Sequence, residues 1–370
     1  MNANTDSFLF QCPTRIYYRH KGLSSIGEIL KKDYSFRRVY VVLGSSSFQR
    51  NGHLEVLEKS LKDQGIEYQI YSGIQSNPDI ADVRKMVVEC RLFVPDALLA
   101  CGGGSVLDAA KLLRHAYYYD GNPMDFLRQS VRPLHSLPLG TVLTLAASGS
   151  EMSDSAVISD RQHHFKGGFN VIANYPTFSL LDPSLFKSVP TYHVACGLAD
   201  MFSHSFERYF SPSHPLEPCD EIALAVMKSI VKASHEMLDK DGDREEGIRA
   251  MILLGSLSHN GLTSYGKKKV FRVHQVEHKL SGKYPELIHG QGIALLMPSY
   301  LKENKELFHD KILRLSRTVF ERETEDVSLA IKYLEDWLSF LPLAHHIEDL
   351  SFFLPKEDWE KAENSLRILP

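Results

Sequence analysis

The sequence lacks the features that would tie it to a membrane, a nucleic acid or a secretory route. No run of about 18 apolar residues occurs, which argues against a membrane-spanning helix. The formal net charge is −4, so no excess of basic residues attracts a nucleic acid or an anionic lipid surface. Residues 1–15 contain no basic segment followed by an apolar one, and we therefore expect no signal peptide.

Paired cysteines are also missing. The five cysteines are odd in number and never form a C-x-x-C pair; they are Cys12, Cys90, Cys101, Cys196 and Cys219. This pattern predicts reduced thiols in a cytoplasmic protein rather than a disulfide framework. Hydrophobic residues make up 43% and charged residues 24%, as in an ordinary globular protein, and 370 residues are enough for two domains.

Short β-rich runs and helical patterns alternate in the first half of the chain. Strands are predicted at residues 37–44, 66–73 and 95–101, and helices at about 54–65, at about 80–93 and after 102–105. This alternation predicts a parallel, doubly wound (Rossmann-like) α/β sheet. From about residue 184 onward the pattern is helical with short loops. We therefore expect an α/β domain at 1–183, an all-α domain at 184–370, and a small-molecule site in the crevice between them.

A glycine-rich turn lies between the third strand and its helix. Gly102, Gly103, Gly104 and Ser105 let the backbone approach a ligand closely, and the N–H groups of the following helix can bind phosphate oxygens. Asp108 lies one turn into that helix. A tight turn without any ligand explains the pattern about equally well, because the G-x-G-x-x-G fingerprint of dinucleotide sites is absent.

Two further segments bear on a nucleotide. The segment 144–158 is rich in small and hydroxylated residues, among them Thr144 and Ser148, which suits a loop against a cofactor or a surface loop. The first strand is followed by Gly44 and three serines, including Ser45 and Ser46, with no acidic residue. A carboxylate there would repel a 2′-phosphate, so its absence favours NADP(H) over NAD(H).

The stretch 193–210 carries a candidate pair of metal ligands. Read as a helix, it places Leu198, Phe202 and Phe206 on one apolar face and Asp200 and His204 one turn apart on another stripe. A carboxylate and an imidazole at this spacing can converge on a divalent metal. Taken alone, however, such a pair more often faces water.

Three histidines lie close together downstream. His274 and His278 are one turn apart on a helical pattern, and His289 follows a break at 282–285. With Asp200 and His204 they offer one carboxylate and three imidazoles, a set that suits iron(II) or zinc(II) with one position open to water or substrate. His278 is then better placed as a proton relay than as a fifth ligand.

Five segments in this order resemble the iron-containing (group III) alcohol dehydrogenase family. They are GGGSVLDAAK (102–111), SGSEMSDSAVISD (148–160), LLDPSLFKSVP (180–190), CGLADMFSHSFERYF (196–210) and VHQVEHKLSGKYPELIHGQGIALLMP (273–298). Within the family, the sequences of SGSEM, ADMFSHSFE and EHKLSGKY are most similar to the butanol dehydrogenase branch. The resemblance implies a dinucleotide-binding domain followed by a helical metal-binding domain, as in the dehydroquinate synthase-like fold.

The resemblance also implies roles for individual residues. The metal ligands would be Asp200, His204, His274 and His289. The cofactor would contact Ser45 and Ser46 at its adenosine ribose; Gly103, Gly104, Ser105 and Asp108 at its pyrophosphate and nicotinamide end; and Thr144 with the following loop, including Ser148. The spacing from His274 to His289 is one residue longer than is usual in the family, and the chain is short at its C-terminus, where we expect an effect on packing or assembly only.

The sequence therefore predicts a metal-dependent, NADP(H)-preferring oxidoreductase that interconverts a primary alcohol and an aldehyde. The expected partners are a small-molecule substrate and a second copy of the chain, because the family is often dimeric; no nucleic acid or membrane is expected. One alternative is an enzyme of the same fold that acts on the terminal hydroxyl of a sugar acid, or a dehydroquinate synthase-like lyase. The other is a non-catalytic scaffold, which the presence of all four ligands disfavours.

Overall fold

The computed structural model describes residues 9–212, 217–264, 267 and 270–368. The chain forms two compact units. The sheet unit consists of Gln11–Ala146 and Ser150–Val189, and the helical unit is built mainly from Pro190 onward and includes Ala147–Gly149. The units thus divide at 189/190, whereas the sequence predicts a domain boundary at 183/184.

A six-stranded parallel sheet organises the sheet unit. Its strands are β1 (Arg15–Tyr18), β2 (Arg38–Gly44), β3 (Glu67–Ile74), β4 (Ala97–Gly102), β5 (Leu139–Leu143) and β8 (Phe178–Leu181). Their order is β1-β8-β5-β4-β2-β3, and every neighbouring pair is parallel. β4 and β5 lie inside the sheet and are buried throughout, as expected of a parallel sheet covered on both faces. The predicted doubly wound α/β fold is confirmed.

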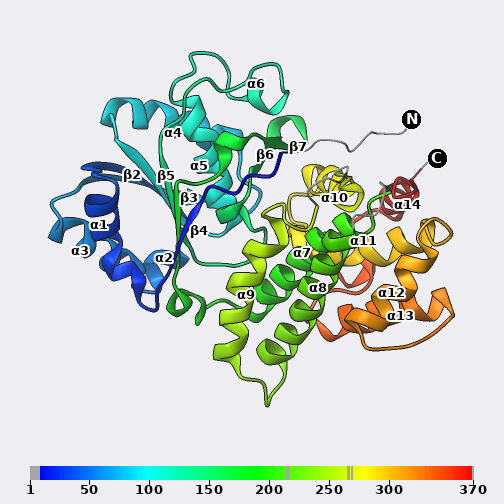
Figure 1. Cartoon of the computed structure of the whole chain (residues 1–370). Helices are drawn as coiled ribbons and strands as arrows, with labels where there is room; N and C mark the ends of the chain where they lie inside the picture. Colours follow the sequence, from blue (N-terminus) through cyan, green and yellow to red (C-terminus); the bar gives the residue numbers. More distant parts are fainter. Residues whose placement is uncertain (1–8, 213–216, 265–266, 268–269, 369–370) are drawn as a thin grey trace. The chain divides into compact units, whose positions relative to one another are not determined.

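Helices connect the strands and cover the sheet (Figure 1). The main ones are α3 (His53–Asp63), α4 (Ile80–Phe93) and α5 (Gly104–Ala116), and the short ones are α1 (Ile26–Glu28), α2 (Ser47–Arg50) and α6 (Met124–Leu127). The chain moves outward from β2 to β3 and then back to β4 and β5. Because such crossovers are right-handed, α4 and α5 pack together on one face of the sheet, while α3 lies with α1 on the other.

An antiparallel hairpin, which the sequence did not predict, interrupts the parallel pattern. It is formed by β6 (Ser155–Asp160) and β7 (Phe165–Asn170), so the predicted loop at 144–158 ends inside a strand. Its two glycines and its exposed turn at 161–164 weaken the usual strand signal. The hairpin packs on α5 through β6 and on α6 through β7.

Buried basic side chains fasten α5 to the segments around this hairpin. Lys111 is fully buried and donates to the carbonyl oxygens of Ser153 and Ser155, at 3.0 and 2.6 Å. Arg114 donates to the carbonyls of Leu137 and Tyr175. Burial lowers the pKa of Lys111 to about 8, against partial compensation by the nearby acidic groups. The buried ammonium therefore satisfies backbone carbonyls at the expense of its own hydration.

The Lys111→Met variant is expected to lose a pH dependence that the wild type shows. The folded pKa of about 8 lies below the ordinary 10.5, so between these values the unfolded state binds more protons and the free energy of unfolding rises with pH. The wild type should gain about 3 kcal/mol relative to the variant across this window. Urea unfolding of both proteins at pH 7.5 and pH 10.5 measures the difference; parallel pH profiles would contradict the assignment of this slope to Lys111.

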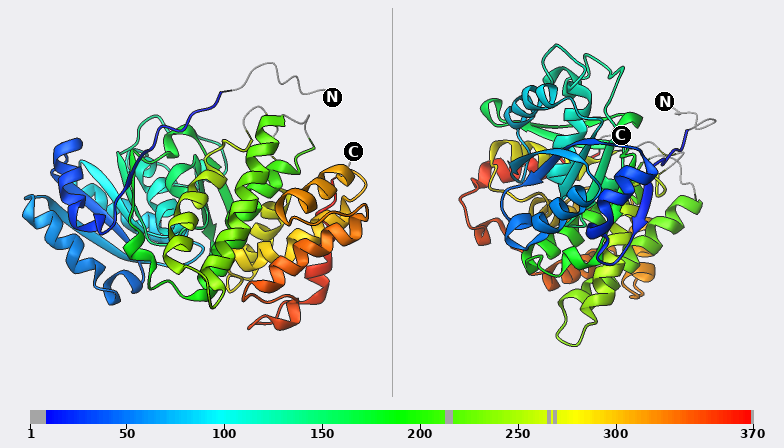
Figure 2. Two further views of the ribbon diagram at one scale, coloured as in Figure 1. Left: turned by 60° about the horizontal axis from the view of Figure 1, so that its bottom comes forward. Right: turned by 90° about the vertical axis from the view of Figure 1, so that its left-hand side faces the viewer.

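The helical unit contains eight α-helices among the described residues and no strand after Val189 in that part of the chain. They are α7 (Thr191–Tyr209), α8 (Glu217–Leu238), α9 (Arg244–His259), α10 (Arg272–Lys283), α11 (His289–Glu303), α12 (His309–Val319), α13 (Val327–Phe340) and α14 (Lys356–Asn364). Figure 2 shows α7, α8 and α9 side by side. Among the described residues, no helix combines the length and apolarity needed to cross a membrane.

α7 is the central helix of this unit. Every residue from Val194 to Tyr209 is buried, so the helix packs on all sides. Its predicted apolar face is buried as expected: Leu198, Phe202 and Phe206 are each 0% exposed. The polar stripe with Asp200 and His204 is buried as well, so these side chains need polar partners inside the unit.

Near the C-terminal end of α7, charged side chains bind the surrounding segments. Asp220 of α8 forms ion pairs with Lys267 and with Lys311 of α12. Lys267 donates to the carbonyl of Arg208, and Lys311 donates to that of Tyr209. We call these three residues the Asp220 cluster. It stabilises the end of the helix that bears Asp200 and His204.

Candidate metal centre

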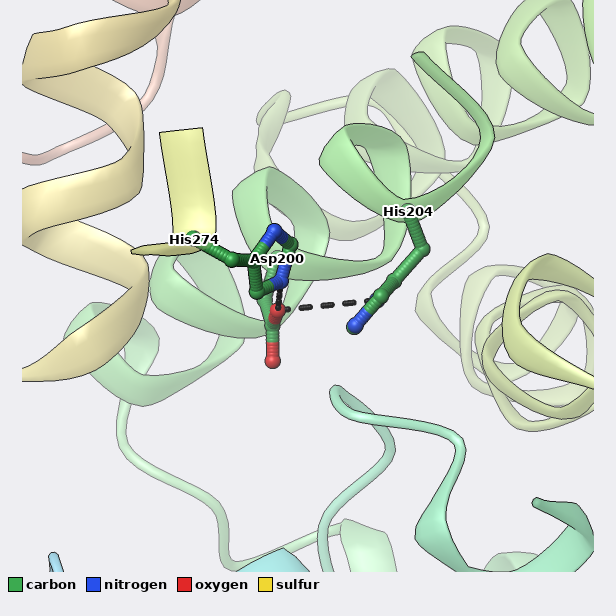
Figure 3. Close-up of side chains that lie close together, drawn as sticks. All are labelled: Asp200, His204 and His274. Atoms are coloured by element: carbon green, nitrogen blue, oxygen red, sulfur yellow. Dashed lines mark ion pairs between the residues drawn. The ribbon is translucent and has the colours of Figure 1, made fainter. Parts of the chain in front are cut away.

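α7 brings Asp200 and His204 together in a buried position. They are 4% and 3% exposed, and their i,i+4 spacing places Nδ1 of His204 3.6 Å from Oδ1 of Asp200. The two side chains therefore do not face water. Figure 3 shows them with His274, which approaches from α10.

The side chains of His274 and His289 meet the same carboxylate oxygen. Nε2 of His274 and Nε2 of His289 each lie 3.7 Å from Oδ1 of Asp200. His289 is the first residue of α11, and the longer spacing from His274 is taken up between the two helices, so its nitrogen reaches the same distance. Three imidazole nitrogens from three helices thus converge on one carboxylate oxygen.

Several of these converging atoms have no hydrogen-bond partner. Oδ1 of Asp200, Nδ1 of His204 and Nε2 of His274 are all buried and unpaired. Three unsatisfied polar atoms within 4.8 Å of one another would be costly unless a further group satisfied them. A divalent cation fits that requirement, because carboxylate oxygen and neutral imidazole nitrogen are both ligands of iron(II) and zinc(II).

Two buried glutamates hold two of the rings from behind. Nδ1 of His274 is hydrogen-bonded to Glu207 of α7, and Nδ1 of His289 to Glu277 of α10. A carboxylate only accepts, so each Nδ1 carries a proton, and Nε2 is the nitrogen that faces Asp200 in both rings. The sequence analysis missed both glutamates. Each glutamate lies three residues after a candidate ligand, but its partner is a histidine on another helix, so the local spacing gives no signal for the contact.

Burial and the neighbouring charges shift the pKa values of His204 and His274 in opposite directions. Burial, followed by repulsion from the neighbouring histidines, holds the pKa of His204 well below its usual range, so His204 is neutral at physiological pH. Burial also disfavours charge on His274, but Glu207 and Asp200 outweigh it and raise the pKa to about 9. A metal that binds at Nε2 of His274 therefore takes the place of a proton.

His278 and His259 border the centre. The ring centroid of His278 lies 6.1 Å from that of His274 and 5.3 Å from that of His289, and the side chain is half-buried. His259, at the end of α9, lies closer still, with its ring centroid 4.0 Å from that of His204. The sequence offered no signal for His259, since a single histidine at a helix end is unremarkable.

The predicted cofactor residues at the glycine turn occupy the N-terminal end of α5. Gly103 precedes the helix, no side chain caps it, and Gly103, Gly104 and Ser105 are all half-buried. Gly102 is required by packing instead, because a Cβ there would lie 2.4 Å from the Val106 side chain. The helix thus presents uncapped N–H groups beside a turn with little side-chain cover.

Asp108 is engaged within the sheet unit. Its carboxylate accepts the Ser150 hydroxyl at 2.6 Å and the Val157 N–H at 2.9 Å, so it joins α5 to the start of the hairpin. Thr144 follows β5, and its N–H donates to the carbonyl of Gly102.

The other predicted cofactor residues lie in two separate segments. Ser45 and Ser46 are exposed between β2 and α2. Ser148 belongs to the Ala147–Gly149 segment, which clusters with the helical unit rather than with the other predicted cofactor residues.

Two protein-family profiles together match most of the chain. The profile described as "Iron-containing alcohol dehydrogenase" matches residues 13–183, and that described as "Fe-containing alcohol dehydrogenase family, C-terminal" matches residues 194–363. The chain belongs to the iron-containing alcohol dehydrogenase family. As a member of this family, it is an NAD(P)-dependent oxidoreductase with a divalent metal site.

Individual family members show how closely the chain follows the family. NADH-dependent butanol dehydrogenase A of Clostridium acetobutylicum is 36% identical over 296 residues, covering 80% of this chain and 75% of the relative. NADPH-dependent aldehyde reductase YqhD of Escherichia coli is 27% identical over 352 residues, covering 93% and 89%. The crystal structure of NADH-dependent butanol dehydrogenase A from Thermotoga maritima matches with a TM-score of 0.91 at 30% identity, covering 98% of this chain and 90% of the other.

Proposed function

We propose that the protein interconverts a primary alcohol and an aldehyde with NADP(H) at a metal centre formed by Asp200, His204, His274 and His289. The observation that carries the proposal is the convergence of three imidazole nitrogens on one buried carboxylate oxygen. A bound iron(II) or zinc(II) ion supplies a Lewis acid that polarises the carbonyl and stabilises negative charge as hydride arrives from the nicotinamide. Butanol dehydrogenases and aldehyde reductases among the relatives support this reaction class.

The protein's own side chains have distinct tasks in this proposal. Asp200, His204, His274 and His289 would hold the ion that polarises the substrate oxygen. His278, beside His274 and His289 but outside the converging atoms, moves a proton between that oxygen and solvent. Gly103, Gly104, Ser105, Asp108, Thr144 and Ser148 serve the pyrophosphate and nicotinamide end of the cofactor, and Ser45 and Ser46 serve its adenosine ribose.

One experiment tests the function as a whole. Elemental analysis of the purified protein is combined with an oxidation assay that pairs NADPH and NADH with a panel of aldehydes, including butanal and methylglyoxal. Bound iron or zinc together with turnover of a simple aldehyde is the expected result. Metal without turnover of any aldehyde would overturn the reaction class and favour a scaffold or a different chemistry on the same fold.

Cofactor choice is tested at Ser45. The exposed turn at Gly44–Ser47 contains no carboxylate, which favours the 2′-phosphate of NADP(H), whereas the 36% identical relative is named for NADH. We expect Ser45→Asp to lower kcat/KM with NADPH by roughly tenfold or more while leaving that with NADH little changed, because a carboxylate repels the phosphate. Steady-state kinetics with both cofactors measures the ratio. Ser24→Asp, at an exposed serine that was not predicted to contact the cofactor, is the control. An unchanged ratio in Ser45→Asp would remove Ser45 from the cofactor site.

The proposal also covers the domain organisation, the cellular location and the oligomeric state. Residues 1–183 form the dinucleotide-binding domain and 184–370 the metal-binding and substrate domain of a cytoplasmic enzyme. A homodimer is also proposed, since β1 forms one edge of the six-stranded sheet. Light scattering of the purified chain tests the dimer.

A further inference from the structure

Two buried glutamates link the three helices that carry the candidate ligands. Glu207 of α7 holds His274 of α10, and Glu277 of α10 holds His289 of α11. Both carboxylates are 0% exposed. We propose that Glu207 and Glu277 are positioning residues that fix the two histidine rings and set the affinity of the centre for its metal. This inference rests on the proposed metal site.

Glu207 fixes both the His274 ring and the start of the helix that carries it. Besides the ring Nδ1, its carboxylate accepts the backbone N–H of Val273 at 2.6 Å and that of His274 at 3.3 Å. The residue that precedes α10, Phe271, provides no side-chain cap, so Glu207 of α7 satisfies these N–H groups instead. The positive end of the α10 dipole adds to this attraction. One carboxylate thus orients the imidazole and sets the position of α10 against α7.

Glu277 holds the ring of His289, the first residue of α11, through its Nδ1. The space that its side chain occupies is provided by Gly292, where a Cβ would lie 2.9 Å from Cγ of Glu277. His289 is less buried than His274, with 24% against 9% of its side chain exposed, so fewer packing contacts hold its ring. The hydrogen bond from Nδ1 to Glu277 is therefore the main restraint on its orientation that the described contacts provide.

The glutamates affect metal affinity in two ways. A fixed ring loses no rotational freedom when it binds, and a carboxylate at Nδ1 makes Nε2 a better donor to a cation. Removing such a partner typically lowers metal affinity by about 10- to 100-fold. His204 faces Asp200 through Nδ1, so its comparable nitrogen is Nε2, and among the described residues no carboxylate pairs with that atom. The proposal is thus specific for His274 and His289.

The test compares Glu207→Gln, Glu277→Gln and the double variant with the wild type. The full chain is freed of metal with a chelator and titrated with Co²⁺, whose visible absorption reports the ligand geometry. Glutamine keeps the size of the side chain but removes the charge and one accepting oxygen. We expect each single variant to bind Co²⁺ about 10- to 100-fold more weakly with an altered visible spectrum, and the double variant to be weaker than either.

Asp220→Asn is the matched control for a purely structural effect. Asp220 is a buried carboxylate of the same unit, 1% exposed, and its ion pairs are with Lys267 and Lys311 rather than with a histidine. This variant should lower Tm at least as much as the glutamate variants while leaving Co²⁺ affinity and spectrum unchanged. If the glutamate variants also kept wild-type affinity and spectrum, the positioning role would be overturned. If the wild type itself bound no Co²⁺, the proposed metal centre would fail, which is a separate result.

Discussion

Replacing His274 by alanine is expected to abolish both metal retention and turnover. Both ring nitrogens of His274 face a carboxylate, Nδ1 that of Glu207 and Nε2 that of Asp200. Its side chain is also more buried than that of His289. Its removal takes one imidazole from the centre and leaves the buried Glu207 carboxylate without its ring partner, which typically costs several kcal/mol. We expect the purified variant to contain less than about a tenth of the wild-type metal and to show no measurable aldehyde reduction.

The control for this prediction is another histidine of the helical unit. His235 of α8 is half-exposed, pairs with Asp239 and is not one of the candidate ligands. His235→Ala should therefore keep wild-type metal content and turnover. Inductively coupled plasma analysis and kinetics of both variants are the measurements. A His274→Ala protein with a full complement of metal and full activity would show that the ligand set is wrong.

The sequence was most informative where the chemistry depends on local spacing. Asp200 and His204 are one turn apart, so a single helix is enough to bring them together. The main strands and helices between residues 37 and 116 were likewise predictable, because each has its own apolar pattern and most are followed within a few residues by a glycine or proline. These features need no knowledge of distant parts of the chain.

The sequence was least informative where a role depends on which helices pack together. Glu207 meets His274 across 67 residues of chain, and no local pattern indicates that contact. A buried glutamate on a helix also looks like an ordinary solvent-facing residue until its partner is known. The same limit applies to β5 and β8, which pair across the hairpin segment, and to Asp108, whose partners Ser150 and Val157 lie 42 and 49 residues further on.

The position after His289 shows a similar dependence on helix packing, and it carries the second large prediction. Gly290 lies against the backbone of α7: a Cβ there would be 2.2 Å from the carbonyl oxygen of Cys196 and 2.7 Å from its Cα. Neither contact can be relieved by rotating a side chain. Gly290→Ala must therefore push the start of α11 away from α7, and with it His289 away from Asp200.

We expect Gly290→Ala to lower the free energy of unfolding by about 3 kcal/mol and to weaken Co²⁺ binding by roughly tenfold or more. Gly168→Ala in β7 is the control, because the nearest atom to its Cβ would be Oδ1 of Asn170 at an ordinary 3.6 Å. That variant should change the unfolding free energy by less than about 0.5 kcal/mol. Urea unfolding and Co²⁺ titration provide both quantities. Equal metal affinity in Gly290→Ala and wild type would mean that His289 reaches the metal independently of the contact between α7 and α11, and the three-helix geometry of the centre would have to be revised.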